Sequence, residues 1–255
     1  MTDPDGTVHR AWPIGDPEVH AAVADALAGS ELLIADGHHR YETARTYADE
    51  VGAGPGDDAR YTLACLVSLE DPGLSVFATH RLLHGLDDDK RHALGATLAE
   101  QFDREPLETP ADLVPDRGDG TIAFGYLDAL DGKPYRLRLA DDSLLADALP
   151  GASAAYRTLD AAALEALILE GALGMSTADI AAKRGLSYCS ELAEAVRRVE
   201  AGEADAGFFL RPTPVGQVRA VADAGETMPP KSTYFFPKLL TGIVFNPLSS
   251  EAPGR

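Results

Sequence analysis

The segment from Leu32 to Val51 constrains the fold of this chain more than any other. A short apolar run, Leu32–Ala35, leads directly into Asp36-Gly37-His38-His39-Arg40, and a helical pattern follows to about Val51. This order predicts a buried strand, a glycine turn and a helix start. The first N–H groups of a helix have no intrahelical partner, and the N-terminus is the positive end of the helix dipole. The turn therefore predicts an anion site, most simply for a phosphate.

The helix after this turn divides into two faces when its residues are placed at helical spacing. The predicted core face comprises Tyr41, Ala44, Tyr47, Ala48 and Val51. The predicted ligand or solvent side comprises His39, Glu42, Thr43 and Thr46. Arg40 lies at the flank of the core face, where an arginine needs a carboxylate or a phosphate as partner. A purely structural alternative remains open, in which Asp36 only caps the helix and both histidines lie at the surface.

The remaining pattern predicts helices and antiparallel hairpins along the whole chain. Helices are expected over 17–28, 88–102, 159–173, 190–201 and 214–224, and strands over 61–69, 74–79, 121–127, 135–139, 206–210 and 242–245. Glu70-Asp71-Pro72-Gly73 is a turn signal that predicts a hairpin or a tight connection, and Asp131-Gly132 predicts a second hairpin. We therefore expect an α/β or α+β fold, a mixed sheet with hairpins and with helices packed on it. Residues 1–150 and 151–255 form either two domains or one merged domain.

Charge excludes two classes of partner. The 255 residues carry a net charge of −19, and a chain this acidic repels a nucleic-acid backbone and an anionic membrane surface. Residues 176–187 resemble the first half of a helix-turn-helix, but the expected second helix, residues 188–198, would present Ser190, Glu191 and Glu194 to DNA, so we reject DNA binding. The N-terminal residues lack the basic start and apolar run of a signal peptide, and two isolated cysteines, Cys65 and Cys189, favour a cytoplasmic protein with buried thiols.

A second candidate site lies near the end of the chain, in Met228-Pro229-Pro230-Lys231-Ser232-Thr233-Tyr234-Phe235-Phe236-Pro237-Lys238. Lysine ammonium groups and serine or threonine hydroxyls donate hydrogen bonds to phosphates and carboxylates, and only five lysines occur in the chain. Lys231, Ser232, Thr233 and Lys238 are therefore candidate phosphate ligands, although the segment lacks the glycines of a P-loop. A rigid, aromatic-packed connection with solvated lysines is the alternative.

A third candidate, Thr79-His80-Arg81, follows directly after a predicted strand. The carboxyl ends of strands are the usual ligand positions in α/β sheets, so His80 and Arg81 are candidate ligand-binding residues. A structural histidine at this place is equally compatible with the sequence.

Metal binding is a further interpretation of the first motif. Asp36, His38, His39 and Glu42 are residue types that bind metals, at helical spacings, and His80 could complete the set only in three dimensions. Asp36 and His38 are the possible ligands, without a firm third partner nearby in the sequence.

Taken together, these motifs resemble the bacterial and archaeal family called domain of unknown function 1015. The resemblance rests on Ile34–Ala44, Asp71-Pro72-Gly73-Leu74, Thr79-His80-Arg81 and Met228–Lys238, which occur in the family's order over nearly the whole chain. Members of that family are usually longer, so we expect this chain, from about Val8-His9-Arg10-Ala11-Trp12-Pro13 onward, to correspond to the C-terminal part. A missing N-terminal half, or a second copy of the chain, is then a possible partner.

The Asp-Gly-His-His-Arg turn is in addition similar to the phosphate-binding turn of the ParB-like superfamily, which includes CTP-binding partition proteins and free-serine kinases. By this resemblance Asp36, Gly37, His38, His39 and Arg40 would hold phosphate, and ATP, ADP or CTP with Mg²⁺ would be the cofactor. The family's activating acid is not identifiable here, and Glu42 is the nearest local substitute.

The leading hypothesis is a small-molecule phosphotransferase acting on a serine-like hydroxyl. Asp36, His39 and Glu42 would be its catalytic residues, and Gly37, His38, Arg40, His80, Arg81, Lys231, Ser232, Thr233 and Lys238 would bind the ligand. The alternatives are a metal-dependent hydrolase using Asp36, His38, His39 and His80, and a non-catalytic nucleotide-sensing module.

Overall fold

The computed structural model describes residues 1–2, 6–116, 120–236, 238, 242–245 and 247–248. The chain divides into two compact units. Unit 1 comprises residues 1–68 and 238–255, and unit 2 comprises residues 69–237. Within the described part, no helix is long and apolar enough to cross a membrane.

Unit 2 contains a six-stranded sheet in the order β3-β5-β4-β7-β2-β6, in which every pair is antiparallel. Its strands are β2 (His80–Leu83), β3 (Phe102–Pro106), β4 (Ala123–Asp128), β5 (Pro134–Leu139), β6 (Leu186–Cys189) and β7 (Ala206–Phe209). Strands from both sides of residue 150 therefore pair in one sheet. A separate two-stranded sheet joins β1 (Ser75–Phe77) to β8 (Tyr234–Phe236).

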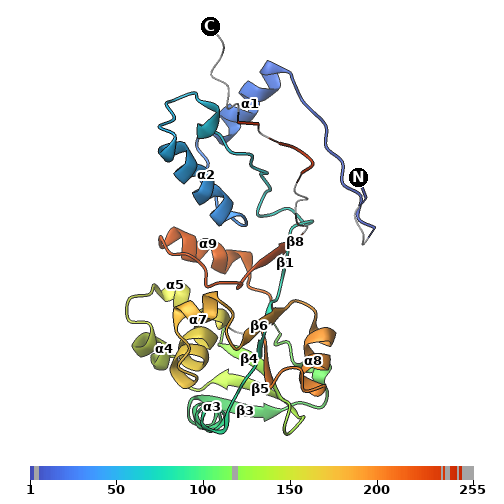
Figure 1. Cartoon of the computed structure of the whole chain (residues 1–255), viewed down its shortest axis with the longest axis vertical. Helices are drawn as coiled ribbons and strands as arrows, with labels where there is room; N and C mark the ends of the chain where they lie inside the picture. Colours follow the sequence, from blue (N-terminus) through green and yellow to red (C-terminus); the bar gives the residue numbers. More distant parts are fainter. Residues whose placement is uncertain (3–5, 117–119, 237, 239–241, 246, 249–255) are drawn as a thin grey trace. The chain divides into compact units, whose positions relative to one another are not determined.

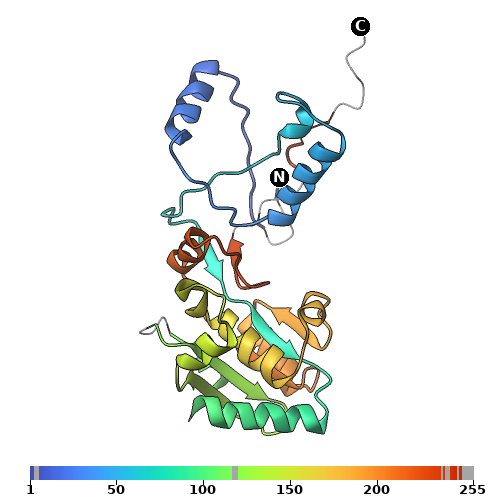
Figure 2. The same ribbon diagram turned by 90° about the vertical axis from the view of Figure 1, so that its left-hand side faces the viewer.

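The helices of unit 2 cover both faces of this sheet (Figures 1 and 2). They are α3 (Asp88–Gln101), α4 (Ser143–Ala148), α5 (Ala154–Arg157), α6 (Asp160–Ala163), the π-helix η3 (Leu164–Ala172), α7 (Thr177–Ala181), α8 (Leu192–Glu200) and α9 (Val215–Asp223), with the 3₁₀ turn η2 (Pro110–Asp112). In Figure 1, α4 and α7 lie to the left of the sheet and α8 lies to its right.

The core of unit 2 follows from the alternation of side chains along its strands. Leu83 and Phe208 pack in a cluster with α3 and η3, whereas Leu82 and Phe209 pack in a second cluster with α8. All four side chains are fully buried. Gly125 in β4 lets the chain at Leu113 pass close to the sheet, because a Cβ atom at residue 125 would lie 2.0 Å from the Leu113 carbonyl oxygen.

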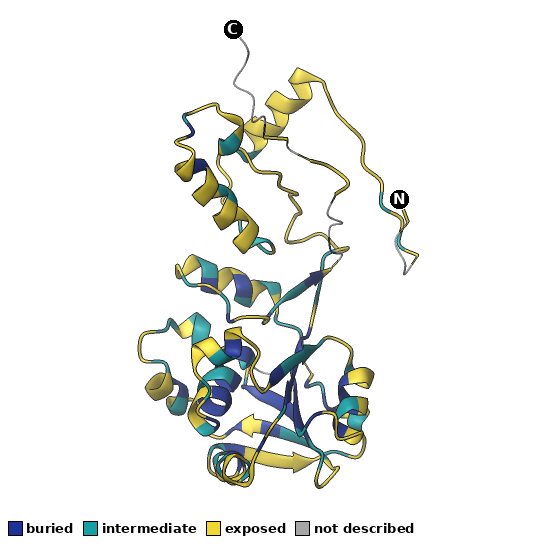
Figure 3. Ribbon diagram, in the orientation of Figure 1, coloured by how far each residue is buried: buried dark blue, intermediate teal, exposed yellow. Residues whose placement is uncertain are grey.

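Among its described residues, unit 1 contains two helices, one 3₁₀ turn and an isolated β-bridge between Thr2 and Val8. The helical elements are α1 (Pro17–Leu27), α2 (His38–Glu50) and the 3₁₀ turn η1 (Asp58–Arg60). Asp16 caps α1 through a hydrogen bond from the Glu18 N–H to its carboxylate, and Pro17 occupies the first helical position. Figure 3 shows that most of residues 1–68 is exposed, whereas buried residues gather in the strands of unit 2.

The predicted α+β class is confirmed, and so are the helices over 88–101, 160–172 and 215–223 and the hairpin of β4 and β5. Three predicted strands, over 32–35, 61–69 and 242–245, were wrong, because none of these residues belongs to a strand. A hairpin across Asp71-Pro72-Gly73 was wrong, since β1 pairs with β8 instead, but the alternative of a tight connection agrees with the turn that the Leu74 N–H closes on the Asp71 carbonyl. A strand needs a partner that supplies backbone hydrogen bonds, and an apolar run does not identify that partner.

The expectation of buried thiols was wrong for Cys65, which is exposed, while Cys189 is half-buried and both are free. The rejection of the helix-turn-helix agrees with the structure, because β6 occupies 186–189 where the second helix would begin.

Candidate functional site

The Asp36 turn, in unit 1, opens helix α2 in an unusual way. Gly37 is the N-cap residue in the left-handed conformation, with φ 85°, and no side chain caps the helix. The structural alternative of an Asp36 cap is therefore wrong. Arg40 folds back over the turn, because a Cβ atom at residue 37 would lie 2.9 Å from its Nη2 atom. Glycine is thus favoured by the positive φ, while the guanidinium above it would have to shift to admit a Cβ atom.

Two cations converge on the carboxylate of Asp36. Arg40 Nη2 lies 3.1 Å from Asp36 Oδ2, and Lys238 Nζ lies 3.1 Å from Asp36 Oδ1. The prediction that Arg40 needs an acidic or phosphate partner is thereby met by Asp36. The Asp36 side chain is 51% exposed and that of Arg40 is 69% exposed, so solvent and small ligands reach both. Exposed ion pairs contribute only about 0.2–1 kcal/mol each, so a ligand could replace Asp36 at little cost.

The other predicted residues of this turn lie at the surface of α2. The rings of His38 and His39 are in contact, with centroids 4.4 Å apart, and His39 and Glu42 are exposed. The expected core face is only partly correct. Ala48 is buried, but Tyr41 and Tyr47 keep 44% and 42% of their surface exposed.

His80 and Arg81, in β2 of unit 2, are almost completely buried, at 1% and 3% exposure. The Nδ1 atom of His80 accepts a hydrogen bond from the Leu210 N–H. Burial, with a smaller contribution from the neighbouring Arg81 charge, lowers the pKa of His80 to about 4, so this imidazole is neutral at neutral pH. The expectation of a satisfied structural histidine fits this environment.

Arg81 connects β2 to the Met228–Thr233 segment. Its guanidinium donates to the carbonyl oxygens of Thr79 and, at 3.3 Å, of Pro230, and it lies over the ring of Tyr188. Burial lowers the pKa of Arg81 to about 10, which leaves it charged at neutral pH. The described residues include no salt-bridge partner for it, but the nearby Glu165 attracts the charge. Burial and then Glu170 raise the pKa of the Glu165 carboxyl, while Arg81 lowers it.

The three residues of the Lys-Ser-Thr motif, Lys231, Ser232 and Thr233, differ in how far they are exposed. Lys231 is exposed and takes a left-handed conformation with φ 56°, whereas Ser232 is 5% exposed. The Ser232 carbonyl accepts a hydrogen bond from Thr213 Oγ1, and its buried Oγ atom has no hydrogen-bond partner among the described residues. Thr233 is half-buried. Lys238, predicted as part of this motif, belongs instead to unit 1 with Asp36.

The predicted residues thus form two groups. Asp36, Arg40 and Lys238 meet in unit 1, and Arg81 meets the Pro230 carbonyl beside Ser232 in unit 2. Across the described ranges, no three His, Cys, Asp or Glu side chains are grouped closely enough to hold a metal ion.

Sequence reasoning missed Glu165 and Tyr188 as neighbours of Arg81, since only the sheet register brings Tyr188 opposite Arg81. Arg211 makes a salt bridge of 2.7 Å with Asp160, and each side chain is only 10% exposed. Arg211 also donates to the Thr121 and Asp116 carbonyls, which indicates a structural role.

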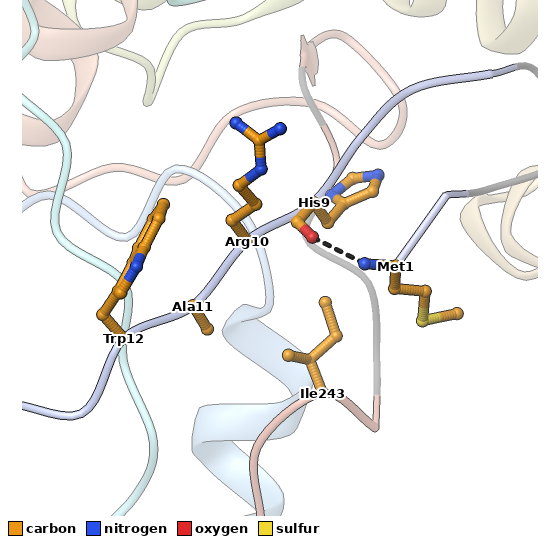
Figure 4. A pocket seen from close by; sticks show the side chains of 6 residues that line it. All are labelled: Met1, His9, Arg10, Ala11, Trp12 and Ile243. Atoms are coloured by element: carbon orange, nitrogen blue, oxygen red, sulfur yellow. Dashed lines mark hydrogen bonds between the residues drawn. The ribbon is translucent and has the colours of Figure 1, made fainter.

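A hollow of about 580 Å³ in unit 1 was also missed as a site. It is lined by Met1, His9, Arg10, Ala11, Trp12 and Ile243 (Figure 4). Trp12 is the only tryptophan of the chain, which is the signal that sequence analysis could have used.

Three comparisons place the chain among known proteins. The family described as "Protein of unknown function (DUF1015)" matches residues 1–162. None of the curated proteins matches this chain.

Among solved structures, a conserved hypothetical protein from Pyrococcus furiosus is 19% identical, with a TM-score of 0.46, over 82% of this chain and 72% of that one. A free serine kinase in complex with AMP is 15% identical, with a TM-score of 0.45, over 86% of this chain and 80% of that one. A mutant of free serine kinase in complex with ADP is 14% identical, with a TM-score of 0.45, over 88% and 81%. Likeness of this degree assigns no activity to the present chain.

Proposed function

The chain belongs to the DUF1015 family of proteins of unknown function, and from this premise we propose that its Asp36 turn binds the phosphate groups of a nucleotide or a related phosphate compound. The observation that carries the proposal is the convergence of Arg40 and Lys238 on Asp36, at the uncapped start of α2. A phosphate group would occupy the place of the Asp36 carboxylate between the two cations and would accept hydrogen bonds from the free N–H groups of the first helical turn.

Solvent exposure supports this exchange. The ion pairs of Asp36 are weak because they are exposed, and a phosphate carries more negative charge than a carboxylate. His38 and His39 add donors at the same helix start. The proposal therefore predicts an affinity that falls as the salt concentration rises, since exposed charges are screened within about 10 Å at moderate salt.

Calorimetric titration with tripolyphosphate tests this site without assuming a nucleotide. We expect Arg40→Ala and Lys238→Ala each to weaken binding by roughly tenfold or more, since a hydrogen bond to a charged group contributes about 1.5–3 kcal/mol. Arg219→Ala is the matched control, because Arg219 is 70% exposed and makes a comparable pair, four residues apart, with Asp223. Equal affinities of wild type and Arg40→Ala would contradict the proposal.

We extend the proposal to phosphoryl transfer, on the resemblance of the turn to that of free-serine kinases. The hydroxyl oxygen of a serine-like substrate would attack the terminal phosphorus of ATP or CTP, the bond to the bridging oxygen would break, and the nucleoside diphosphate would leave. The hydroxyl proton would pass to a carboxylate, for which Glu42 and Asp36 are the candidates in this turn. Mg²⁺ bound to the nucleotide would offset the charge of the phosphates.

A phosphorus NMR assay with ATP or CTP, Mg²⁺ and serine tests the extension. Phosphoserine should form with wild type and should be strongly reduced in Glu42→Gln or Asp36→Asn, while tripolyphosphate still binds. Binding by wild type without any phosphoserine would restrict the protein to a non-catalytic nucleotide-binding module.

A further inference from the structure

We propose that the hollow beside Trp12 receives the base of a nucleotide whose phosphates bind at the Asp36 turn. This inference rests on the proposed function and deepens it, because it names the part of the ligand that lies beyond the phosphates.

The volume of the hollow suits a small ligand. Its volume of about 580 Å³ falls within the range of about 300–1,000 Å³ that is usual for small-molecule sites. Figure 4 shows the side chains of Arg10 and Trp12 extending to one side of their segment, while Met1 and Ile243, the latter from a separate segment, lie on its other side. The Met1 ammonium donates to the His9 carbonyl oxygen and the His9 N–H donates to the Met1 carbonyl oxygen, which hold this part of the segment in place.

The exposure of Trp12 is the first argument for a base. Tryptophan is buried to a large extent in most proteins, because its indole ring has a large apolar surface. Trp12 keeps 74% of its surface exposed. An exposed indole face is a platform on which a base can stack, and every base offers such a face.

The charge of the lining is the second argument. Within the described part of the chain, no acidic side chain lines the hollow, whereas those of Arg10 and His9 do. An electron-rich ring or an adjoining anionic group is therefore favoured over a cation. A guanidinium beside an indole also stacks on planar rings, as arginine does in nucleic-acid sites.

Chain connectivity relates the hollow to the phosphate site. Lys238 binds Asp36, and Ile243 lines the hollow. Ile243 lies five positions after Lys238, so their Cα atoms lie no more than about 18 Å apart at full extension. Both sites belong to unit 1.

The fluorescence of the single tryptophan gives a direct test. Wild-type protein is titrated separately with tripolyphosphate, with adenosine and with ATP. A base stacked on Trp12 should quench its emission, so adenosine and ATP are expected to quench and tripolyphosphate is not. ATP should also bind more tightly than adenosine, since it engages both sites.

Variants measured by calorimetry complete the test. Trp12→Leu should weaken ATP binding by about tenfold, because stacking on an aromatic side chain contributes about 1–3 kcal/mol per base. The same variant should leave tripolyphosphate affinity unchanged. Leu130→Ala is the control, because Leu130 is 76% exposed and lies in the turn between β4 and β5 of unit 2.

The outcomes separate the two proposals. Tripolyphosphate binding that is lost in Arg40→Ala, together with ATP binding that neither quenches Trp12 nor changes in Trp12→Leu, would overturn the base site and leave the phosphate site in place. Absence of tripolyphosphate binding would instead overturn the phosphate site. Quenching by adenosine, lost affinity in Trp12→Leu and intact tripolyphosphate binding support the base site.

Discussion

The two units of this chain differ most in what they bury. Unit 2 encloses Phe124, Phe208 and Phe209 at 0% exposure, within clusters on both faces of its sheet. Unit 1 buries only two apolar residues among those described, Ala48 and Ala53. Nearly all of the large apolar side chains that stay exposed in the described residues also lie in unit 1, the exceptions being Leu69, Phe77, Leu130 and Phe236.

The well-packed core and the candidate ligand-binding groups therefore lie in different units of the chain. Burial of apolar surface is the main favourable contribution to folding, so we expect unit 2 to be more stable than unit 1. Unit 1 carries the exposed donors of the Asp36 turn and the hollow at Trp12, on segments with few buried contacts. Ligand-binding segments generally come from the less stable parts of a protein.

The largest expected effect comes from truncating a buried ring of unit 2. Phe208→Ala should lower the free energy of unfolding by about 3–5 kcal/mol, because it removes apolar contacts and leaves a cavity. Tyr47→Ala is the counterpart in unit 1 and should change it by less than about 1 kcal/mol, since Tyr47 is 42% exposed. Urea unfolding measures the free energy of unfolding of both variants. Similar decreases for Phe208→Ala and Tyr47→Ala would contradict the difference in burial between the units.

A methyl group inside the sheet should have the next largest effect. Gly125→Ala should destabilise unit 2 by about 3 kcal/mol, because the new Cβ atom would collide with the Leu113 backbone. Gly95→Ala is the control within α3, where no atom lies within 4 Å, and it should stabilise the helix by about 0.5–1 kcal/mol. Urea titrations should show a lower free energy of unfolding for Gly125→Ala and a higher one for Gly95→Ala. An unchanged value for Gly125→Ala would show that the Leu113 backbone can move away from the sheet.

The buried histidine of unit 2 should make its stability depend on pH. The pKa of His80 falls from 6.5 to about 4 on folding, because burial disfavours the charged imidazole. The unfolded chain therefore binds the proton more readily, and stability is present above about pH 6.5 and lost as the pH falls toward 4. The loss is on the order of 3 kcal/mol.

The difference between wild type and His80→Gln isolates this contribution, because carboxylates that titrate in the same range are common to both. The urea midpoint of wild type should fall more steeply with decreasing pH than that of His80→Gln. The control in unit 1 is His39→Gln, because the His39 ring is exposed. Its urea midpoint should fall with decreasing pH as steeply as that of wild type. Parallel curves for wild type and His80→Gln would contradict the buried, neutral state of His80.

The smallest of these effects is expected at the start of α2. Gly37→Ala places a Cβ atom at φ 85° and 2.9 Å from Arg40 Nη2, which should cost about 1–2 kcal/mol and displace the guanidinium. Hydrogen exchange should quicken in α2 and stay unchanged in unit 2, and tripolyphosphate should bind more weakly. Gly52→Ala has a similar positive φ but no atom within 4 Å, so it should leave tripolyphosphate affinity as it is.

Local patterns were sufficient for most helices and for one hairpin. Asp16-Pro17 and Asp87 mark the starts of α1 and α3, because a side-chain cap acts within one turn of chain. Asp131-Gly132 joins β4 to β5 for the same local reason, with Gly132 at φ 64°. The catalytic and ligand roles of the predicted residues stay predictions until binding and transfer are measured.

Long-range pairing was beyond such patterns. Leu32–Ala35 and Tyr61–Leu69 have strand-like composition, yet none of these residues belongs to a strand, whereas β1 pairs with β8 about 160 residues away. The sequence by itself determined the local elements, the acidic charge and the donor-rich Asp36 turn, because helix periodicity, turn chemistry and charge act between near neighbours. Only the tertiary structure decided that Lys238 reaches Asp36, that Arg81 is buried against Pro230, and that Trp12 stays exposed beside Ile243. Burial and ion pairing depend on which distant segments of the chain come into contact. The pattern of residues within one segment does not specify those contacts.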